Sequence, residues 1–166
     1  MSGHSSQPAA CKIRPATDAD RPFVFAMVAQ LSQAHEAYDA KRWVAPAAIA
    51  EVYDAWFARA AAGDDLAIFI AHPPGEAALG YLVAEAWPAM PQFWSPACVY
   101  VHDIFVNPAA RAGGAGEALL NAARAWGRER GLTQVRALVS SHNKAALTYF
   151  ERRGFRVSAA EITLDL

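Results

Sequence analysis

The sequence contains few cysteines and no excess of charge of either sign. Its 166 residues include two cysteines, Cys11 and Cys98, which lie far apart and form no CxxC pair. This excludes a disulfide framework and the usual spacing of a metal site, so we predict no metal. Two isolated cysteines indicate a reducing compartment, and we expect a cytoplasmic protein. The formal net charge of −1 gives no electrostatic basis for nucleic acid as a partner.

Long hydrophobic runs and internal repeats are also absent. No apolar stretch approaches the roughly 20 residues that cross a membrane, so we expect no membrane partner. Residues 1–10 are small and polar and lack the charged and apolar regions of a signal peptide, so we interpret them as a flexible N-terminal arm. Because 54% of the residues are hydrophobic, the remainder, residues 11–166, is expected to form one globular domain.

The periodicity of apolar residues predicts short strands that alternate in part with helices. One helix follows Thr17 and fades near Gln33, and a second begins at Pro46 and ends at Gly63. The expected order is βααβββαβαβ(β), an α+β arrangement in which helices cover a mixed sheet of six to seven strands. The strands are predicted at 11–15, 66–71, 78–84, 98–106, 135–139 and 155–166, and the last two helices at about 115–130 and 143–153.

One segment has the strongest functional signal. The apolar residues 104–106 end a strand, and Arg111, Gly114 and Gly116 follow directly before a helical pattern. Such a strand–glycine loop–helix unit can hold phosphate, because glycines let backbone N–H groups converge at the positive end of the helix. The lysine of the Walker motif is missing, and Leu119 stands where the dinucleotide fingerprint needs a third glycine. A glycine-rich connection that binds nothing is the alternative.

The pattern Arg111-x-x-Gly114-x-Gly116, in this context, resembles the acyl-CoA pyrophosphate loop of the GNAT superfamily of N-acetyltransferases. Residues 143–155, with an Asn before a helix and Gly-Phe after it, are similar to a second GNAT segment. The resemblance covers most of the chain. It implies a mostly antiparallel central sheet with about four helices and acetyl-CoA as cofactor. It also implies transfer of an acetyl group to a primary amine of a small molecule or protein by direct attack in a ternary complex. Because GNAT proteins are often dimers, the resemblance also implies a homodimer.

The resemblance also implies which residues bind acetyl-CoA. Backbone N–H groups at the strand end would polarise the thioester carbonyl, and Asn143 would contact the pantetheine arm. Asn143 also suits the N-cap of its helix, and both roles can hold at once. The implied set is Ile104, Phe105, Val106, Arg111, Ala112, Gly113, Gly114, Ala115, Gly116, Glu117, Asn143, Ala146 and Phe150.

The sequence departs from the family at the proposed general acid. The tyrosine credited with protonating the CoA thiolate stands four residues before the glycine, and here that position is Phe150. Tyr149 is adjacent, but one residue along a helix rotates the side chain by about 100°, so we expect Tyr149 to point elsewhere. Tyr149 is the candidate acid, with a packed or surface tyrosine as the alternative. A non-catalytic acyl-CoA-binding module of the same fold therefore stays open.

His102 and Asp103 are the candidates for the general base. As neighbours on a strand they are expected to face opposite ways. A histidine titrates near neutral pH and suits a base, whereas the alternative is a histidine satisfied by a backbone carbonyl or an ion pair. Glu85 is a further candidate for the base or for holding an ammonium group, with a solvated charge at a strand end as its alternative.

Acceptor specificity is expected from residues 35–43 and from residues 87–94 of a proline-rich loop. Acidic side chains there would attract a cation, and aromatic rings would form a pocket wall. The candidate acceptor-binding residues are Glu36, Tyr38, Glu85, Trp87 and Trp94.

Overall fold

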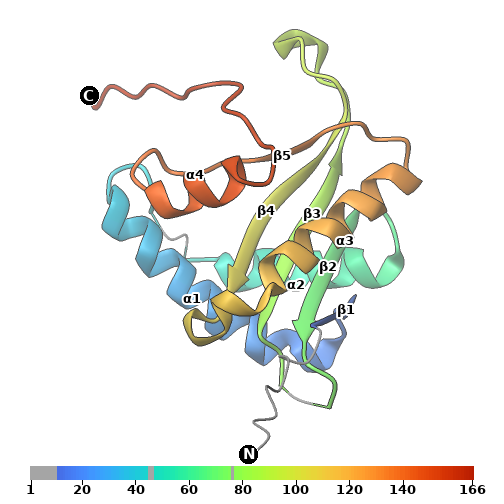
Figure 1. Cartoon of the computed structure of the whole chain (residues 1–166). Coiled ribbons are helices and arrows are strands. Elements are labelled where there is room, and N and C mark those ends of the chain that lie inside the picture. The colour runs from blue at the N-terminus through green and yellow to red at the C-terminus, as the bar shows by residue number, and fades with distance from the viewer. Residues whose placement is uncertain (1–10, 45–46, 76) are drawn as a thin grey trace, which may run out of the picture.

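A five-stranded sheet forms the centre of the computed structural model, which describes residues 11–44, 47–75 and 77–166 (Figure 1). Its strands lie in chain order, β1-β2-β3-β4-β5, and all neighbours are antiparallel except the parallel pair β4–β5. The predicted N-terminal arm and Pro46 lie outside the described residues. The strands are β1 (Lys12–Pro15), β2 (Leu66–His72), β3 (Gly80–Trp87), β4 (Cys98–Val106) and β5 (Val135–Ala137).

In the described part of the chain, four α-helices cover the two faces of the sheet, as predicted (Figure 1). On one face Val24, Tyr53 and Ile70 belong to a core shared by α1, α2 and β2, and on the other Leu119 and Phe150 belong to a core beneath α3 and α4. None of the helices in the described residues is both long and apolar enough to cross a membrane. The helices are α1 (Arg21–Tyr38), α2 (Ile49–Ala62), α3 (Ala115–Glu129) and α4 (Lys144–Glu151), with 3₁₀ turns η1 (Asp18–Asp20), η2 (Pro91–Phe93) and η3 (Pro108–Gly113).

Residues 155–166 form no strand in the described structure, so the prediction of six to seven strands is wrong and the sheet has five. The alternation of apolar and polar residues in 161–166 is typical of a strand, but a strand needs a neighbour that satisfies its backbone groups. Ile162 and Leu164 are instead 93% and 83% exposed. Several boundaries also differ, and two of these lie near the candidate site: α1 continues to Tyr38, and Trp87 belongs to β3 rather than to the loop.

Candidate active site

A β-bulge in β4 shapes the centre of the candidate site. Val83 of β3 pairs with Asp103, and the next residue, Ala84, pairs with Val101, so His102 is an extra residue in β4. The bulge interrupts the alternation of side chains. His102 contacts Trp56 of α2, so its ring lies on the face that α2 covers. Asp103 lies two residues before Phe105 and therefore shares its face, and Phe105 packs in the α1–α2 core. The prediction that His102 and Asp103 face opposite ways is therefore wrong.

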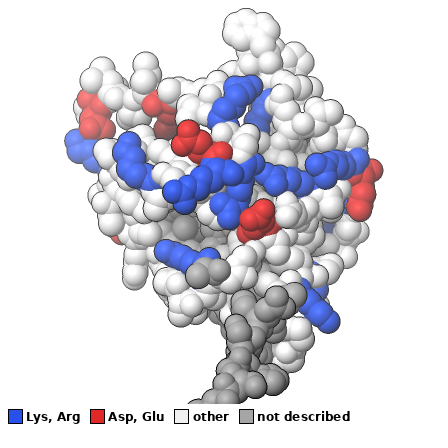
Figure 2. All heavy atoms as spheres, in the orientation of Figure 1, with Lys and Arg blue, Asp and Glu red and all other residues white. Residues whose placement is uncertain are grey.

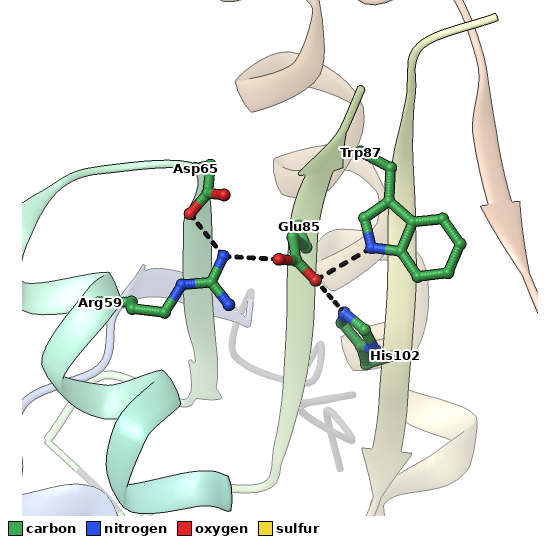
Figure 3. A network of polar contacts seen from close by, with 5 residues as sticks. All are labelled: Arg59, Asp65, Glu85, Trp87 and His102. Carbon is green, nitrogen blue, oxygen red and sulfur yellow. Dashed lines mark hydrogen bonds and ion pairs between the residues drawn. The ribbon is translucent and has the colours of Figure 1, made fainter. Parts of the chain in front are cut away.

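Glu85 of β3 joins His102 to a polar network, drawn in Figure 3. One oxygen of the Glu85 carboxylate accepts hydrogen bonds from His102 Nε2 at 2.6 Å and from Trp87 Nε1 at 2.9 Å. The other oxygen accepts a hydrogen bond from Arg59 of α2, which also pairs with Asp65. Burial raises the pKa of Glu85, but the hydrogen bonds from Arg59, His102 and Trp87 outweigh it and hold this pKa below its usual value. Glu85 is 16% exposed, not a solvated charge at a strand end.

This network determines which ring nitrogen of His102 is free. With Nε2–H donated to an ionised carboxylate, Nδ1 retains a lone pair that can accept a proton. The ring of His102 lies 4.6 Å from that of Trp56 and 5.1 Å from that of Tyr100, between ring centroids. Trp87 stacks on Tyr100 at 3.8 Å. His102 is therefore an oriented base candidate inside an aromatic enclosure.

Asp103, the other base candidate, has a different environment. Burial is the cause that raises the pKa of its carboxyl group to about 7 from the usual 3.8. A carboxyl group with such a pKa can exchange a proton near neutral pH. The structure thus brings both predicted base candidates to one face of the sheet.

The glycine loop leads directly into α3. Gly114 is the N-cap of α3 at φ +78°, a conformation that favours glycine, and a Cβ there would meet no atom within 4 Å. Gly113 has the same open space, and Ala112 lies beside it in η3. Arg111 is exposed, and its Nε donates to the Val106 carbonyl at 3.2 Å. Free N–H groups at a helix start, open space and an exposed cation fit a diphosphate.

The edge of β4 opens beyond the bulge. β5 pairs only with Val99–Val101, and no other described strand follows on that side. The Val106 carbonyl points to this edge, where it accepts the Arg111 bond. By strand alternation the backbone amides of Ile104 and Val106 face the open edge. The backbone of Phe105 faces β3 instead, since its carbonyl oxygen lies 2.5 Å from where a Cβ on Gly80 would stand.

The residues of α4 divide between capping and packing. The Asn143 side chain accepts a hydrogen bond from the Ala146 N–H at 3.0 Å, so its N-cap role is confirmed. Phe150 is 8% exposed and packs against Phe155. Ala146 belongs to the same cluster. In the first turn of α3, Ala115 is buried, whereas Glu117 is exposed and pairs with Arg153 at 3.4 Å.

The ring of Tyr149 meets that of Phe150 edge to face, with ring centroids 5.5 Å apart, and packs against the same core cluster. Its hydroxyl lies against the first turn of α3, 2.6 Å from where a Cβ on Gly116 would stand. The Arg153 guanidinium covers the ring at 3.7 Å from its centroid. The hydroxyl is buried and has no hydrogen-bond partner among the described residues. Burial raises the pKa of Tyr149.

The candidate acceptor residues do not form one cluster. Glu85 and Trp87 lie in the network around His102, whereas Trp94 is 93% exposed at the hairpin tip that projects beyond the sheet (Figure 1). Glu36 and Tyr38 lie in the last turns of α1. Sequence reasoning missed Arg59 and Trp56, although a lone arginine in the apolar helix over residues 49–62 was a usable signal.

Together, an open strand edge, a glycine-lined helix start and a histidine–carboxylate pair define a candidate acyl-CoA site in an α+β sheet. Residues 29–155 match the acetyltransferase (GNAT) family. This match covers more than half of the chain, which therefore belongs to the GNAT family of acetyl-CoA-dependent N-acetyltransferases.

Other known proteins resemble the chain in part of its sequence or in its fold. A 55-residue segment, 33% of the chain, is 40% identical to an uncharacterized N-acetyltransferase of Methanocaldococcus jannaschii, and the match spans 24% of that relative. The BH1408 protein of Bacillus halodurans has the same fold, with a TM-score of 0.79 and 21% identity over 93% of this chain and 99% of that one. So does aminoglycoside N-acetyltransferase AAC(6')-Iy in complex with CoA, with a TM-score of 0.73 and 20% identity over 97% of both chains.

Proposed function

We propose that this protein transfers an acetyl group from acetyl-CoA to a primary amine of a small molecule or a protein. The amine attacks directly in a ternary complex formed by a single catalytic domain, residues 11–166. The observation that carries the proposal is the His102–Glu85 pair, 2.6 Å apart, on the strand whose open edge presents the Ile104 and Val106 amides.

The cofactor half of this site would bind by backbone groups. When bound, acetyl-CoA supplies the reactive thioester. The amides of Gly113 to Gly116 at the start of α3 would hold its diphosphate, with Arg111 adding a full positive charge. The amides of Ile104 and Val106 would donate to the carbonyl oxygen as negative charge develops there.

The acceptor half would remove the proton from the attacking amine. We assign that role to His102 Nδ1, because Glu85 holds Nε2 and stabilises the imidazolium that forms. Arg59 favours the ionised form of Glu85, since it donates to the second carboxylate oxygen. Asp103 is the second candidate base, because burial raises its pKa to about 7.

We assign no acid role to Tyr149. Its hydroxyl lies against α3 rather than in the His102 network, and Phe150 cannot donate a proton. A thiolate is a tolerable leaving group, with a thiol pKa of about 8.5, so water or the imidazolium can return the proton.

The test is turnover with a panel of amines, measured by release of the free CoA thiol. The panel includes aminoglycosides, because AAC(6')-Iy and meta-AAC0020, whose structure holds sisomicin, are solved proteins of this fold. It also includes polyamines and lysine peptides. Thiol release that depends on one of these amines supports the proposal. A thermal shift with acetyl-CoA but no release with any acceptor favours the alternative, an acyl-CoA-binding module.

Two further proposals concern the protein's setting. Isolated cysteines favour a cytoplasmic location. We also propose a homodimer, since the chain leaves large apolar side chains such as Ile162 and Leu164 exposed.

A further inference from the structure

Three aromatic side chains surround the proposed base, His102. Its ring lies 4.6 Å from that of Trp56, measured between ring centroids. The rings of Tyr100 and Trp87 follow at 5.1 and 6.0 Å. Each of these three aromatic residues is partly exposed, so part of its ring surface is open to a ligand. An amine whose nitrogen reaches His102 therefore places its neighbouring carbon atoms against aromatic rings.

Trp87 and Tyr100 together form an aromatic wall of this enclosure. Their rings are stacked 3.8 Å apart with an interplanar angle of 3°. The two residues belong to the paired strands β3 and β4, and the indole N–H of Trp87 donates to Glu85 at 2.9 Å. The aromatic wall is thus ordered without a ligand, which lowers the entropic cost of binding a flat group against it. Another aromatic ring is the group that gains most from such a surface.

The polar network beside the aromatic wall has the charge to attract one cation (Figure 3). Asp65 and Glu85 carry two negative charges and Arg59 carries one positive charge, so these three residues have a net charge of −1. His102 is neutral when it acts as the base. The carboxylate of Glu85 already accepts hydrogen bonds from Arg59, His102 and Trp87, so it attracts an ammonium group by its charge while its oxygens stay engaged. One ammonium group balances this network.

Other charged groups near the enclosure add little to this balance. Burial raises the pKa of Asp103 to about 7, so its carboxyl group is protonated in part near neutral pH. Burial also raises the pKa of Tyr100, and the nearby charges of Arg42 and Glu161 act on this pKa in opposite directions. Arg42 Nη2 donates to Glu161 Oε2 at 3.1 Å, so this pair contributes no net charge. The enclosure therefore suits an acceptor with one positive charge rather than several.

The outer surface also disfavours an acceptor with several positive charges. Figure 2 shows that Lys and Arg side chains gather in a band across the face that carries α3 and α4. The additional amino groups of an aminoglycoside or a polyamine would meet charge of the same sign there. In the described part of the chain, a groove on this face is lined by no acidic residue and by five arginines, namely Arg124, Arg128, Arg136, Arg153 and Arg156.

We propose that the acceptor is an arylalkylamine, a primary amine with a single positive charge and an aromatic ring on a short alkyl chain. Its ring stacks on the aromatic wall of Trp87 and Tyr100, and its nitrogen lies at His102 Nδ1. As the nitrogen of the neutral amine bonds to the acetyl carbon and the C–S bond of acetyl-CoA breaks, an amine proton passes to His102 and the CoA thiolate leaves. The inference names the substrate class of the proposed acetyltransferase and rests on that proposed function.

The first test compares turnover with matched amines, measured by release of the free CoA thiol. Phenethylamine is compared with cyclohexylethylamine, its saturated counterpart, and with spermidine, sisomicin and a lysine peptide. We expect kcat/KM, referred to the neutral form of each reacting amine, to be higher for phenethylamine by about threefold or more over cyclohexylethylamine, and by about tenfold or more over the others. An equal or higher value for any of these other amines overturns the proposal.

Variants of the aromatic wall test the contact itself. Tyr100→Leu should raise KM for phenethylamine about tenfold with kcat nearly unchanged, and it should remove the preference over cyclohexylethylamine. Tyr100→Phe keeps the ring and should keep the low KM. Phe93→Leu, at an exposed aromatic residue outside the enclosure, is the control and should change neither value. An equal thermal shift with acetyl-CoA shows that each variant is folded, and a preference that survives in Tyr100→Leu overturns the proposal.

A binding measurement separates failure of this inference from failure of the proposed function. If no amine releases thiol, acetyl transfer is wrong, and binding then decides the inference. In the presence of CoA, phenethylamine should raise the Tm of the wild-type protein and of Tyr100→Phe but not that of Tyr100→Leu. Absence of this shift in the wild-type protein overturns the inference. Thiol release with spermidine or sisomicin alone rejects the arylalkylamine but supports the acetyltransferase.

Discussion

The cofactor half and the acceptor half of the candidate site are built in different ways. The proposed cofactor half, apart from its residues in and next to α4, lies within residues 104–117 and consists mainly of backbone amides and glycines. The acceptor half consists of side chains from three elements, Arg59 of α2, Glu85 of β3 and His102 of β4. A site made of consecutive backbone groups can be recognised from a local pattern of residues. A site made of side chains from several elements depends on how the fold brings distant segments together.

The bulge at His102 connects the two halves. It brings His102 to the face that carries Glu85 and Trp56, and it shifts the following residues by one position. The amides of Ile104 and Val106 thereby face the open edge of β4. This is the same edge at which the Val99 N–H donates a hydrogen bond to the Gln134 carbonyl, in the segment before β5. One inserted residue thus sets both the proposed base and the proposed carbonyl donors.

The largest effect is expected in the cofactor half. Gly114→Asp should abolish the thermal shift with acetyl-CoA, because it places a carboxylate where the diphosphate would bind. In the wild-type protein, ligand at 100 times its Kd stabilises by about 2.7 kcal/mol. Gly131→Asp is the matched control, since Gly131 has φ +71° just beyond the other end of α3. Equal shifts in the two variants would contradict the assignment of the loop.

In the acceptor half, His102→Ala should lower turnover about a hundredfold, the usual contribution of a general base. The thermal shift with acetyl-CoA should stay unchanged, since His102 lies outside the cofactor half. His72→Ala, at the end of β2, serves as the control and should retain full turnover. Steady-state kinetics with one good acceptor provides the measurement, and a loss below threefold would reject His102 as the base.

Glu85→Gln should have an intermediate effect, about tenfold on kcat with little change in KM for acetyl-CoA. The amide keeps the shape of Glu85 but not the charge that stabilises the imidazolium and selects the Nε2–H tautomer. Ring ¹⁵N chemical shifts of His102 report the tautomer directly. If the tautomer and kcat are both unchanged, Glu85 only packs beside His102.

Asp103→Asn should change the pH dependence of stability. Burial raises the pKa of Asp103 to about 7 in the folded state, whereas the unfolded value is near 3.8. Between these pH values the unfolded chain binds fewer protons than the folded protein. The contribution of Asp103 to the free energy of unfolding is therefore lost as pH rises from about 4 to 7. The Tm of the wild-type protein should therefore fall relative to the variant over this range. Parallel Tm curves would show that Asp103 is not desolvated.

The smallest effect is expected for Tyr149→Phe. The hydroxyl has no partner in the described structure, so its loss should leave Tm equal or slightly higher and turnover within about threefold. Gly116→Ala should lower Tm by placing a Cβ 2.6 Å from that hydroxyl, and adding Tyr149→Phe should restore part of it. If Tyr149→Phe lowers turnover more than His102→Ala does, Tyr149 is the acid after all.

The sequence by itself determined the features that depend on neighbouring residues. Gly114 predicted the start of α3, and Asn143 predicted a helix cap. These follow from backbone conformation and helical period, which act over a few residues.

Only the tertiary structure decided the features that depend on pairing between distant segments. The bulge that turns His102 and Asp103 to one face comes from the register of β3 against β4, which neither strand specifies alone. The contact of Arg59 with Glu85 needs α2 packed on that sheet. Residues 161–166 have the pattern of a strand but pair with no described strand, and a strand forms only where its backbone hydrogen bonds find a partner.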